Sequence, residues 1–247
     1  TLIDFYEKGL QSRYKIIFNI TKIVIRSAEF VVFNSETQRD LYIRFYGLNS
    51  EKTIEIKNPA PSVERGALYA DKIPEKVIVF AGRLIAMKNV DTAIRAFAKL
   101  EDKSFKFRII GDGPREEELK ALVRELGIAN RVTFEPSMLA KDLYESIKNC
   151  YYVIIPSWTD VSPNQVYECL SYKIPVLLTK ENYLDTGLKE EHMVDPRSIE
   201  DMESKMNMLL DSSNYNEFKE EFFKIKQPED WKRVTEKHLE IFDRIYK

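Results

Sequence analysis

The chain has 247 residues, of which 44% are hydrophobic and 32% are charged. This balance is typical of a globular protein with enough apolar residues for a substantial core. The formal net charge of -2 gives no electrostatic reason to expect a nucleic-acid-binding protein, and no unbroken apolar segment reaches the length of a membrane span.

The first part of the chain is predicted to hold two helices and two short strands. Residues 5–27 have a helical pattern, residues 28–35 are typical of a strand, and the helix that follows is expected to end at Gly47. A second short strand is expected over residues 53–58. Three prolines within residues 58–76 then predict a linker.

From residue 77 onward, β-branched apolar runs alternate with amphipathic segments. This alternation predicts βαβ units, and therefore a parallel sheet between two layers of helices. The expected strands are 77–81, 106–110, 131–134, 151–155 and 175–178. The expected helices are 90–100, 115–126, 140–149, 164–171, 198–210, 214–224 and 229–246.

Two cations follow the first strand of this alternating region. Gly82 and Arg83 come directly after the apolar run VIVFA, and Lys88 follows before the next helix. The loop beyond the carboxyl end of a parallel strand is where open α/β sheets bind ligands. An arginine fork and a lysine point charge at this place predict a diphosphate site that needs no metal.

A second segment, WTDVSPNQVYECLSYKIPVL, predicts the same kind of ligand. Ser162 is the expected N-cap of a helix, with Pro163 at the first helical position and Asn164 next. The unpaired N–H groups and the positive dipole end of a helix start suit a phosphate. Asp160 and Glu168 flank this start, where they would accept hydrogen bonds from hydroxyls on either side of the phosphate. Together the two segments indicate a nucleotide-sugar site.

Three ordered segments resemble the signatures of the group 1 glycosyltransferases. They are AGRLIAMK, IIGDGPREEELKALVRELGIANRVTF and IIPSWTDVSPNQVYECLSYKIPV, and the resemblance covers roughly residues 29–247. Members of this family have the GT-B fold and transfer a sugar from a nucleotide diphosphate with retention of configuration. The spacing of the family's E-x(7)-E hallmark is matched here, with Asp160 in the first place and Glu168 in the second.

The resemblance implies a role for each candidate residue. Arg83 and Lys88 would stabilise the departing nucleoside diphosphate. Glu168 would bind the nucleotide ribose, and Asp160 would contact hydroxyls of the donor sugar. The other positions that would contact the donor are Gly82, Gly111, Pro136, Met138, Ser162, Pro163 and Asn164. For the turn at Gly111, a purely structural role remains an equal alternative.

Some positions depart from the family pattern. Val161 stands where a glycine is common, and Asp160 is one methylene shorter than the usual glutamate. After Thr179 the chain continues as KENYLDTG, where the family has a Gly-Gly turn and a glutamate near the donor. The donor contacts of this loop and the identity of the sugar therefore stay open.

The resemblance predicts an α/β fold with a Rossmann-like parallel sheet sandwiched by helices, the C-terminal half of a GT-B architecture. The expected divisions are a residual part of the N-terminal domain (1–57), a linker (58–76), a nucleotide-sugar-binding domain (77–227) and a helix that crosses back to the N-terminal domain (228–247). Most of the N-terminal domain is then missing from these residues, so the chain is expected to be inactive alone.

The sequence is interpreted as the donor-binding part of a retaining, metal-independent hexosyltransferase of the cytoplasm, without a cofactor and with a glycan or a lipid-linked group as acceptor. Two alternatives stay open: a non-catalytic nucleotide-sugar-binding or regulatory module, and a nucleotide-sugar epimerase of the same architecture. The GxGxxG and GxxxxGK[ST] motifs are both absent, which argues against a dehydrogenase and a nucleotide hydrolase.

The helix expected over residues 5–27 carries five cations beside many apolar residues. Such a helix either packs on the missing N-terminal domain or lies at the inner face of an anionic membrane, where a lipid-linked acceptor would wait.

The two cysteines, Cys150 and Cys169, sit in or beside apolar runs and are expected to be buried free thiols. His192 and His238 lie far apart, without a cluster of cysteines or acids at metal-ligand spacing. No metal site is therefore expected.

Overall fold

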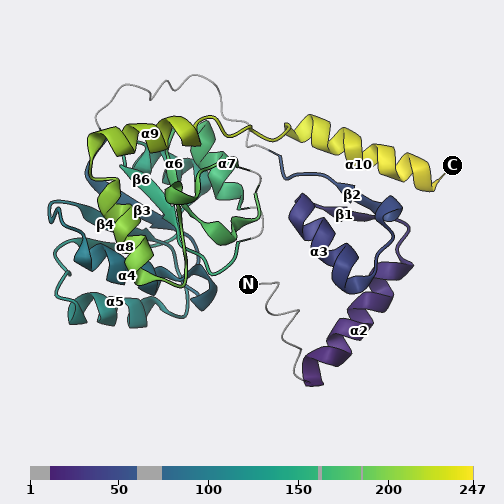
Figure 1. Cartoon of the computed structure of the whole chain (residues 1–247), viewed down its shortest axis with the longest axis horizontal. Coiled ribbons are helices and arrows are strands. Elements are labelled where there is room, and N and C mark those ends of the chain that lie inside the picture. The colour runs from purple at the N-terminus through teal and green to yellow at the C-terminus, as the bar shows by residue number, and fades with distance from the viewer. Residues whose placement is uncertain (1–11, 60–73, 161–162, 185, 247) are drawn as a thin grey trace.

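The computed structural model describes residues 12–59, 74–160, 163–184 and 186–246. These residues form two lobes (Figure 1). The larger lobe contains a six-stranded sheet with helices around it, and the described part of the smaller lobe contains a two-stranded sheet with two helices.

The six strands of the larger sheet are all parallel, in the order β5-β4-β3-β6-β7-β8. The strands are β3 (Val77–Ala81), β4 (Lys106–Ile110), β5 (Val132–Glu135), β6 (Tyr152–Ile155), β7 (Val176–Thr179) and β8 (Met193–Val194). Val79 of β3 pairs with Arg108 of β4 on one side and with Val153 of β6 on the other. The apolar β-branched runs suit these inner positions, because both faces of the sheet are covered.

Helices cover both faces of this sheet. They are α4 (Val90–Lys99), α5 (Glu116–Glu125), α6 (Ala140–Ile147), α7 (Asn164–Ser171), α8 (Ile199–Met208) and α9 (Ser212–Phe222). Ile78 and Phe80 point into a buried cluster with α4, α5, α8 and α9, whereas Val79 and Ala81 join a cluster with α6 and α7. Alternate side chains of a strand thus reach opposite layers. The predicted α/β fold, a Rossmann-like parallel sheet sandwiched by helices, is confirmed.

Several of the shortest elements are not predicted by the sequence pattern. β8 has only two residues, and four single 3-10 turns are also present. The turns are η1 (Ser50–Lys52), η2 (Ala86–Lys88), η3 (Lys180–Asn182) and η4 (Glu190–His192). Two or three residues are too few to display a hydrophobic period.

The smaller lobe is built from α2 (Ser12–Ser27), β1 (Val31–Phe33), α3 (Glu36–Tyr46) and β2 (Thr53–Glu55), with β1 and β2 parallel. The strand expected over 28–35 is reduced to three residues, because Ser35 instead caps α3 and accepts a hydrogen bond from the Gln38 N–H at 3.2 Å. Gly47 ends α3 as predicted, in a left-handed conformation with φ of 64°.

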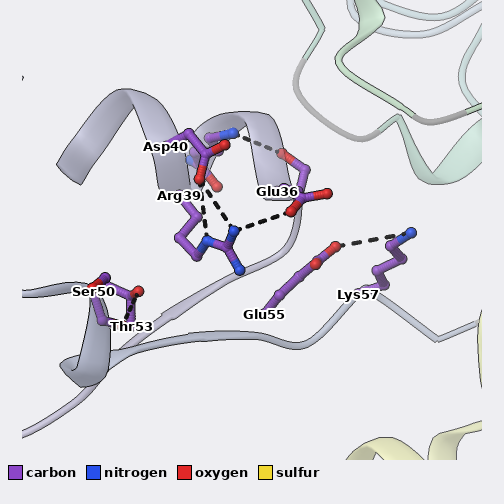
Figure 2. Close-up of polar contacts among 9 residues, drawn as sticks. Glu36, Arg39, Asp40, Ser50, Thr53, Glu55 and Lys57 are labelled. Carbon is purple, nitrogen blue, oxygen red and sulfur yellow. Dashed lines mark hydrogen bonds and ion pairs between the residues drawn. The ribbon is translucent and has the colours of Figure 1, made fainter. Parts of the chain in front are cut away.

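Charged side chains gather around the start of α3 and the end of β2 (Figure 2). Arg39 lies 3.0 Å from Glu36 and 3.2 Å from Asp40, and Lys57 lies 3.8 Å from Glu55. Exposed ion pairs of this kind contribute little to stability. Apolar packing therefore holds the lobe together, and Phe33, Tyr46 and Leu48 form one of its buried clusters.

The last helix, α10 (Trp231–Ile245), extends from the larger lobe to the smaller one (Figure 1). Its buried residues Val234 and Ile241 pack with Ile56, directly after β2. The chain that follows the larger lobe therefore contributes to the core of the smaller one. The domain limits given above stay a prediction, and residues 60–73 of the expected linker lie outside the described residues.

Helix α2 covers the described part of the helix predicted over residues 5–27, and it exposes an apolar face. The large exposed side chains of this face are Ile16, Ile17, Ile20, Ile23 and Val24. Across the described ranges, none of the helices combines the length and apolarity needed to cross a bilayer.

We expect Ile241→Ala to weaken the docking of α10, because Ile241 is only 8% exposed and its loss leaves a void against Ile56. The opening free energy of β1 and β2 should fall by about 2 kcal/mol or more, measured by hydrogen exchange of their amides. Leu239→Ala is the matched control on the same helix, because Leu239 is 57% exposed. It should change the exchange by less than about 0.5 kcal/mol, and equal effects of the two variants would contradict this packing.

Candidate functional site

A cavity of about 560 Å³ opens at the carboxyl ends of β3 and β4. Ligands bind at this edge of open parallel sheets, and the volume is in the range of small-molecule sites. The lining comes from the ends of β3 and β4, the loop after β5, α6 and α7. The residues are Ala81, Gly82, Arg83, Ile110, Gly111, Asp112, Ser137, Met138, Ala140, Leu143, Tyr144, Gln165 and Glu168.

The structure brings some of the predicted site residues together in this cavity and leaves others out. The predicted residues in its lining are Gly82, Arg83, Gly111, Met138 and Glu168. Those described but outside the lining are Lys88, Pro136, Asp160, Pro163 and Asn164. Ser162 lies outside the described residues, as does Val161.

The floor of the cavity is a direct contact between the loops after β3 and β4. The Gly82 N–H donates to the Ile110 carbonyl at 2.9 Å, and the Leu84 N–H donates to the Asp112 carbonyl at the same distance. A Cβ on Gly111, whose φ is 142°, would lie 2.0 Å from the Gly82 oxygen. Glycine is therefore required at position 111 for the close approach of the two loops, whatever its contact with a ligand.

Arg83 is the exposed cation of this cavity. It follows β3 directly, and its side chain has no ion-pair partner among the residues that the structure describes. An unpaired guanidinium in a concave site is suited to bind a planar or tetrahedral oxyanion, because it presents several donors in a fixed fork.

Lys88 is paired with Asp160, 72 positions later in the chain. The Lys88 ammonium lies 2.5 Å from the Asp160 carboxylate, and the Ser157 hydroxyl donates to the same oxygen at 3.1 Å. The two side chains are only 26% and 17% exposed. The backbone supports the pair, because the Trp158 N–H donates to the Met87 carbonyl at 3.0 Å. The residue predicted to bind phosphate and the residue predicted to bind the sugar thus form an ion pair with each other.

The buried side chain of Asn89 holds the Lys88 segment in place. Its amide donates to the carbonyls of Pro156 at 3.0 Å and Pro196 at 2.8 Å, and it accepts from the Thr92 hydroxyl at 2.7 Å. Asn89 has a left-handed φ of 53°, which asparagine tolerates better than most residues. The sequence analysis missed this residue, and an asparagine at a helix start was the one signal for it.

Glu168 is held by a residue that the sequence analysis also missed. The Tyr144 hydroxyl on α6 donates to Oε2 of Glu168 at 2.5 Å. Burial raises the pKa of Tyr144 well above its ordinary value, so the hydroxyl stays protonated and acts as a donor. Gln165, one turn before Glu168, donates to the Ala81 carbonyl at 3.1 Å and fixes α7 to the end of β3.

The start of α7 differs from the prediction. Pro163 is the N-cap, with φ of -65° and an extended ψ of 109°, and no side chain caps the helix within the described residues. The prediction of Pro163 at the first helical position is therefore wrong by one residue, since the fixed φ of proline is compatible with both positions. Asn164 is exposed, and its side-chain oxygen accepts a hydrogen bond from Asn58 at 2.8 Å.

The loop after β5 is tied to the loop after β4. The Asp112 carboxylate accepts a hydrogen bond from the Ser137 N–H at 3.0 Å, and hydrogen bonding by the Ser137 side chain, followed by that of its backbone, lowers the pKa of Asp112. Met138, next in the chain, lines the cavity, whereas Pro136 is exposed outside it. Of the loop after β5, Ser137 and Met138 thus line the cavity.

The segment after Thr179, which departs from the family pattern, lies beside Asp160. The Asp160 N–H donates to the Glu181 carbonyl at 2.9 Å. The Glu181 carboxylate is itself bound by Arg197 at 3.1 Å and by the Tyr183 hydroxyl at 3.0 Å. The backbone of this segment therefore supports Asp160, while the Glu181 side chain is engaged elsewhere.

Cys150 and Cys169 are both buried free thiols, as predicted, and burial raises the pKa of Cys150 to about 12. A thiol with so high a pKa is unreactive near neutral pH. In the parts of the chain that the structure describes, no group of three or more His, Cys, Asp or Glu side chains is arranged to hold a metal ion.

The chain belongs to the group 1 glycosyltransferases. The family model described as "Glycosyl transferases group 1" matches residues 70–225, which is more than half of the chain. The matched region contains β3 to β8 and every residue of the cavity. The resemblance of the sequence signatures to this family is thereby confirmed.

Curated relatives match the same part of the chain. An uncharacterized glycosyltransferase of Haemophilus influenzae is 24% identical over 199 residues, covering 77% of this chain and 54% of the relative. The D-inositol 3-phosphate glycosyltransferase of Mycobacterium bovis is 30% identical over 182 residues, covering 68% of this chain and 37% of the relative. The chain thus spans about half the length of the first curated relatives that it matches.

Solved structures share the fold. HepE of Anabaena, crystallised with UDP and glucose, is 18% identical with a TM-score of 0.73, covering 96% of this chain and 68% of HepE. Sucrose-phosphate synthase of Thermosynechococcus elongatus is 16% identical with a TM-score of 0.75, covering 99% of this chain and 65% of the synthase. At these identities the likeness concerns the fold, which is that of the GT-B glycosyltransferases.

We expect Gly111→Ala to destabilise the larger lobe by about 2–4 kcal/mol, because the new Cβ collides with the Gly82 carbonyl and the backbone is strained. Gly127→Ala is the matched control. Gly127 also has a positive φ, of 67°, but a Cβ there would have no neighbour within 4 Å, so only about 1–2 kcal/mol of backbone strain is expected. Urea unfolding followed by circular dichroism measures both. Equal losses would show that the loop contact does not require glycine.

Proposed function

We propose that this chain binds the nucleotide-diphosphate sugar donor of a retaining, metal-independent hexosyltransferase. The observation that carries the proposal is the cavity at the carboxyl edge of the sheet, in which an unneutralised Arg83 and a half-exposed Glu168 carboxylate are both present. A nucleotide-diphosphate sugar carries phosphates, which a cation binds, and sugar hydroxyls, which donate hydrogen bonds to a carboxylate. This cavity contains both kinds of side chain.

Arg83 would act on the leaving diphosphate. Negative charge grows there as the bond to the sugar breaks, and a fixed cation in a cleft stabilises this charge without a metal. Lys88 would add a second charge from the same loop once the donor separates it from Asp160. We therefore propose that the reaction needs no cofactor.

Asp160 would bind the donor sugar rather than attack it. Its carboxylate is already bound by Lys88 and Ser157, so the oxygen that they hold is engaged within the protein rather than free to attack the sugar. The supporting backbone of Glu181 keeps the Asp160 loop in place. The sugar hydroxyls would then exchange with Lys88 as partners of Asp160.

The acceptor and the N-terminal domain belong to the same proposal. The exposed apolar face of α2 is the kind of surface that a neighbouring domain or a membrane covers. We favour the domain, and the chain by itself would then bind nucleotide weakly and turn over little. The acceptor would reach the donor from that side.

A non-catalytic binding module is the second candidate, and the Lys88–Asp160 pair favours it. A catalytic lysine and a sugar-binding acid that neutralise each other are also what a site without turnover would tolerate. Formation of a glycosylated product by the full-length protein decides for the transferase, and tight donor binding without product decides for the module.

The proposed function is tested by thermal shift with UDP, ADP, GDP and UDP-glucose, the first and last being ligands crystallised with HepE. At least one should raise the melting temperature, because a ligand at 100 times its Kd stabilises the folded state by about 2.7 kcal/mol. Arg83→Ala should reduce the affinity for that ligand by about tenfold or more. Arg95→Ala, an exposed arginine of α4 outside the cavity lining, should not. If none of the four ligands raises the melting temperature, the proposal is excluded.

We expect Asp160→Asn to strengthen the binding of UDP relative to that of UDP-glucose. Releasing Lys88 from its partner at 2.5 Å frees a cation for the phosphates, so UDP should bind about three- to tenfold tighter. UDP-glucose should gain less or lose affinity, because Asp160 no longer accepts from the sugar. Asp91→Asn, which breaks the ion pair between Asp91 of α4 and Arg115 at the start of α5, is the control and should alter neither. Titration calorimetry measures the ratio of the affinities for UDP and UDP-glucose. If Asp160→Asn leaves this ratio unchanged, Asp160 does not bind the sugar.

A further inference from the structure

Tyr144 and Glu168 form a hydrogen-bonded pair in the wall of the cavity. The phenol hydroxyl lies 2.5 Å from Oε2 of the carboxylate. Tyr144 is only 2% exposed, whereas Glu168 is half-buried, and both contribute to the lining. A fully buried donor therefore holds one oxygen of an acid that lines the cavity.

The tyrosine ring is locked by α7, the helix that also carries Glu168. Tyr144 stacks on Tyr172 with ring centroids 4.7 Å apart and an interplanar angle of 19°. Tyr172 ends α7, and its N–H donates to the Glu168 carbonyl at 3.1 Å. The Tyr172 ring and Glu168 thus lie on successive turns of α7. The Tyr144 hydroxyl cannot move without disturbing its stacking on Tyr172 and its hydrogen bond to Glu168.

The hydrogen bond between Tyr144 and Glu168 leaves one carboxylate oxygen of Glu168 to accept a hydrogen bond from a ligand. A phenol has one proton to donate, and it is directed to Oε2. A carboxylate offers about four lone-pair sites on two oxygens. Among the described residues, no other side chain donates to Oε1. This oxygen is therefore an oriented acceptor beside the cavity.

We propose that Tyr144 is a positioning residue that orients the Glu168 carboxylate toward a ribose hydroxyl, so that the site prefers ribonucleotides to deoxyribonucleotides. The inference rests on the proposed function, because it requires the cavity to take a nucleoside diphosphate. Its physical basis is preorganisation: an acid already held in one rotamer loses less freedom when the ligand binds.

The test is calorimetric titration of the chain with UDP, 2′-deoxy-UDP, 3′-deoxy-UDP and pyrophosphate. The wild type should bind UDP about tenfold more tightly than at least one deoxy analogue, since a hydrogen bond to a charged group is lost. Tyr144→Phe keeps the stacked ring and removes the hydroxyl. It should weaken the binding of UDP about fivefold, and it should change the affinity for the deoxy analogue and for pyrophosphate by no more than about twofold. The preference for ribose therefore shrinks.

Two further variants separate positioning from folding. Tyr215→Phe is the matched control, because Tyr215 is also buried and donates its hydroxyl to the Tyr151 carbonyl at 2.7 Å, outside the cavity lining. It should leave the ribose preference intact. Glu168→Gln should abolish the preference, and Tyr144→Phe added to Glu168→Gln should have no further effect on it.

Each result has one meaning. If the wild type binds none of the four probes, nor ADP or GDP, the proposed function itself fails. If UDP binds but the deoxy analogues bind equally well, or if Tyr144→Phe leaves the ratio unchanged, the inference about Tyr144 is wrong and the nucleotide site stands. Should Tyr144→Phe not fold, Glu168→Gln alone decides, because an unchanged ribose preference in that variant also overturns the inference.

Discussion

The site depends on a backbone contact between the loops that follow β3 and β4. Each loop leaves its strand at the same edge of the sheet, and Gly111 allows the second loop to lie against the carbonyl of Gly82. Asp112 then holds the next loop through Ser137. A side chain at position 111 would separate these segments, and with them Arg83 from the Met138 side of the cavity.

The strand order explains why the cavity opens here. From β3 the chain proceeds outward through β4 and β5, then returns to β6 on the other side of β3 and proceeds outward again through β7 and β8. Loops on either side of this reversal diverge and leave a crevice, which is the ligand site of doubly wound sheets. Arg83 is on the loop that follows the central strand, and α7 borders the crevice from the β6 side through Gln165 and Glu168.

The polar groups near the cavity form two separate clusters, and no hydrogen bond or ion pair joins them within the part of the chain that the structure describes. One consists of Tyr144 and Glu168, between α6 and α7. The other joins Lys88 and Asp160, with Asn89 binding the carbonyls of Pro156 and Pro196 behind them. In the proposed function the cluster of Tyr144 and Glu168 binds the nucleotide, and the cluster of Lys88 and Asp160 binds the sugar. A partly buried ion pair in the second cluster means that donor binding must compete with an interaction inside the protein.

The sequence by itself determined the order and type of the helices and longer strands of the larger lobe. It also predicted Arg83 and Glu168 as binding residues, because strand periods, glycine turns, cations after a strand and motif spacing are local features. It did not identify Tyr144 or Asn89, which read as a core aromatic and a helix-start residue, and it misplaced Pro163 by one position. Only the tertiary structure decided that Lys88 meets Asp160 and that Tyr144 meets Glu168. These partners are 72 and 24 positions apart, and side chains so distant in the chain are brought together by sheet order and helix packing rather than by local propensity.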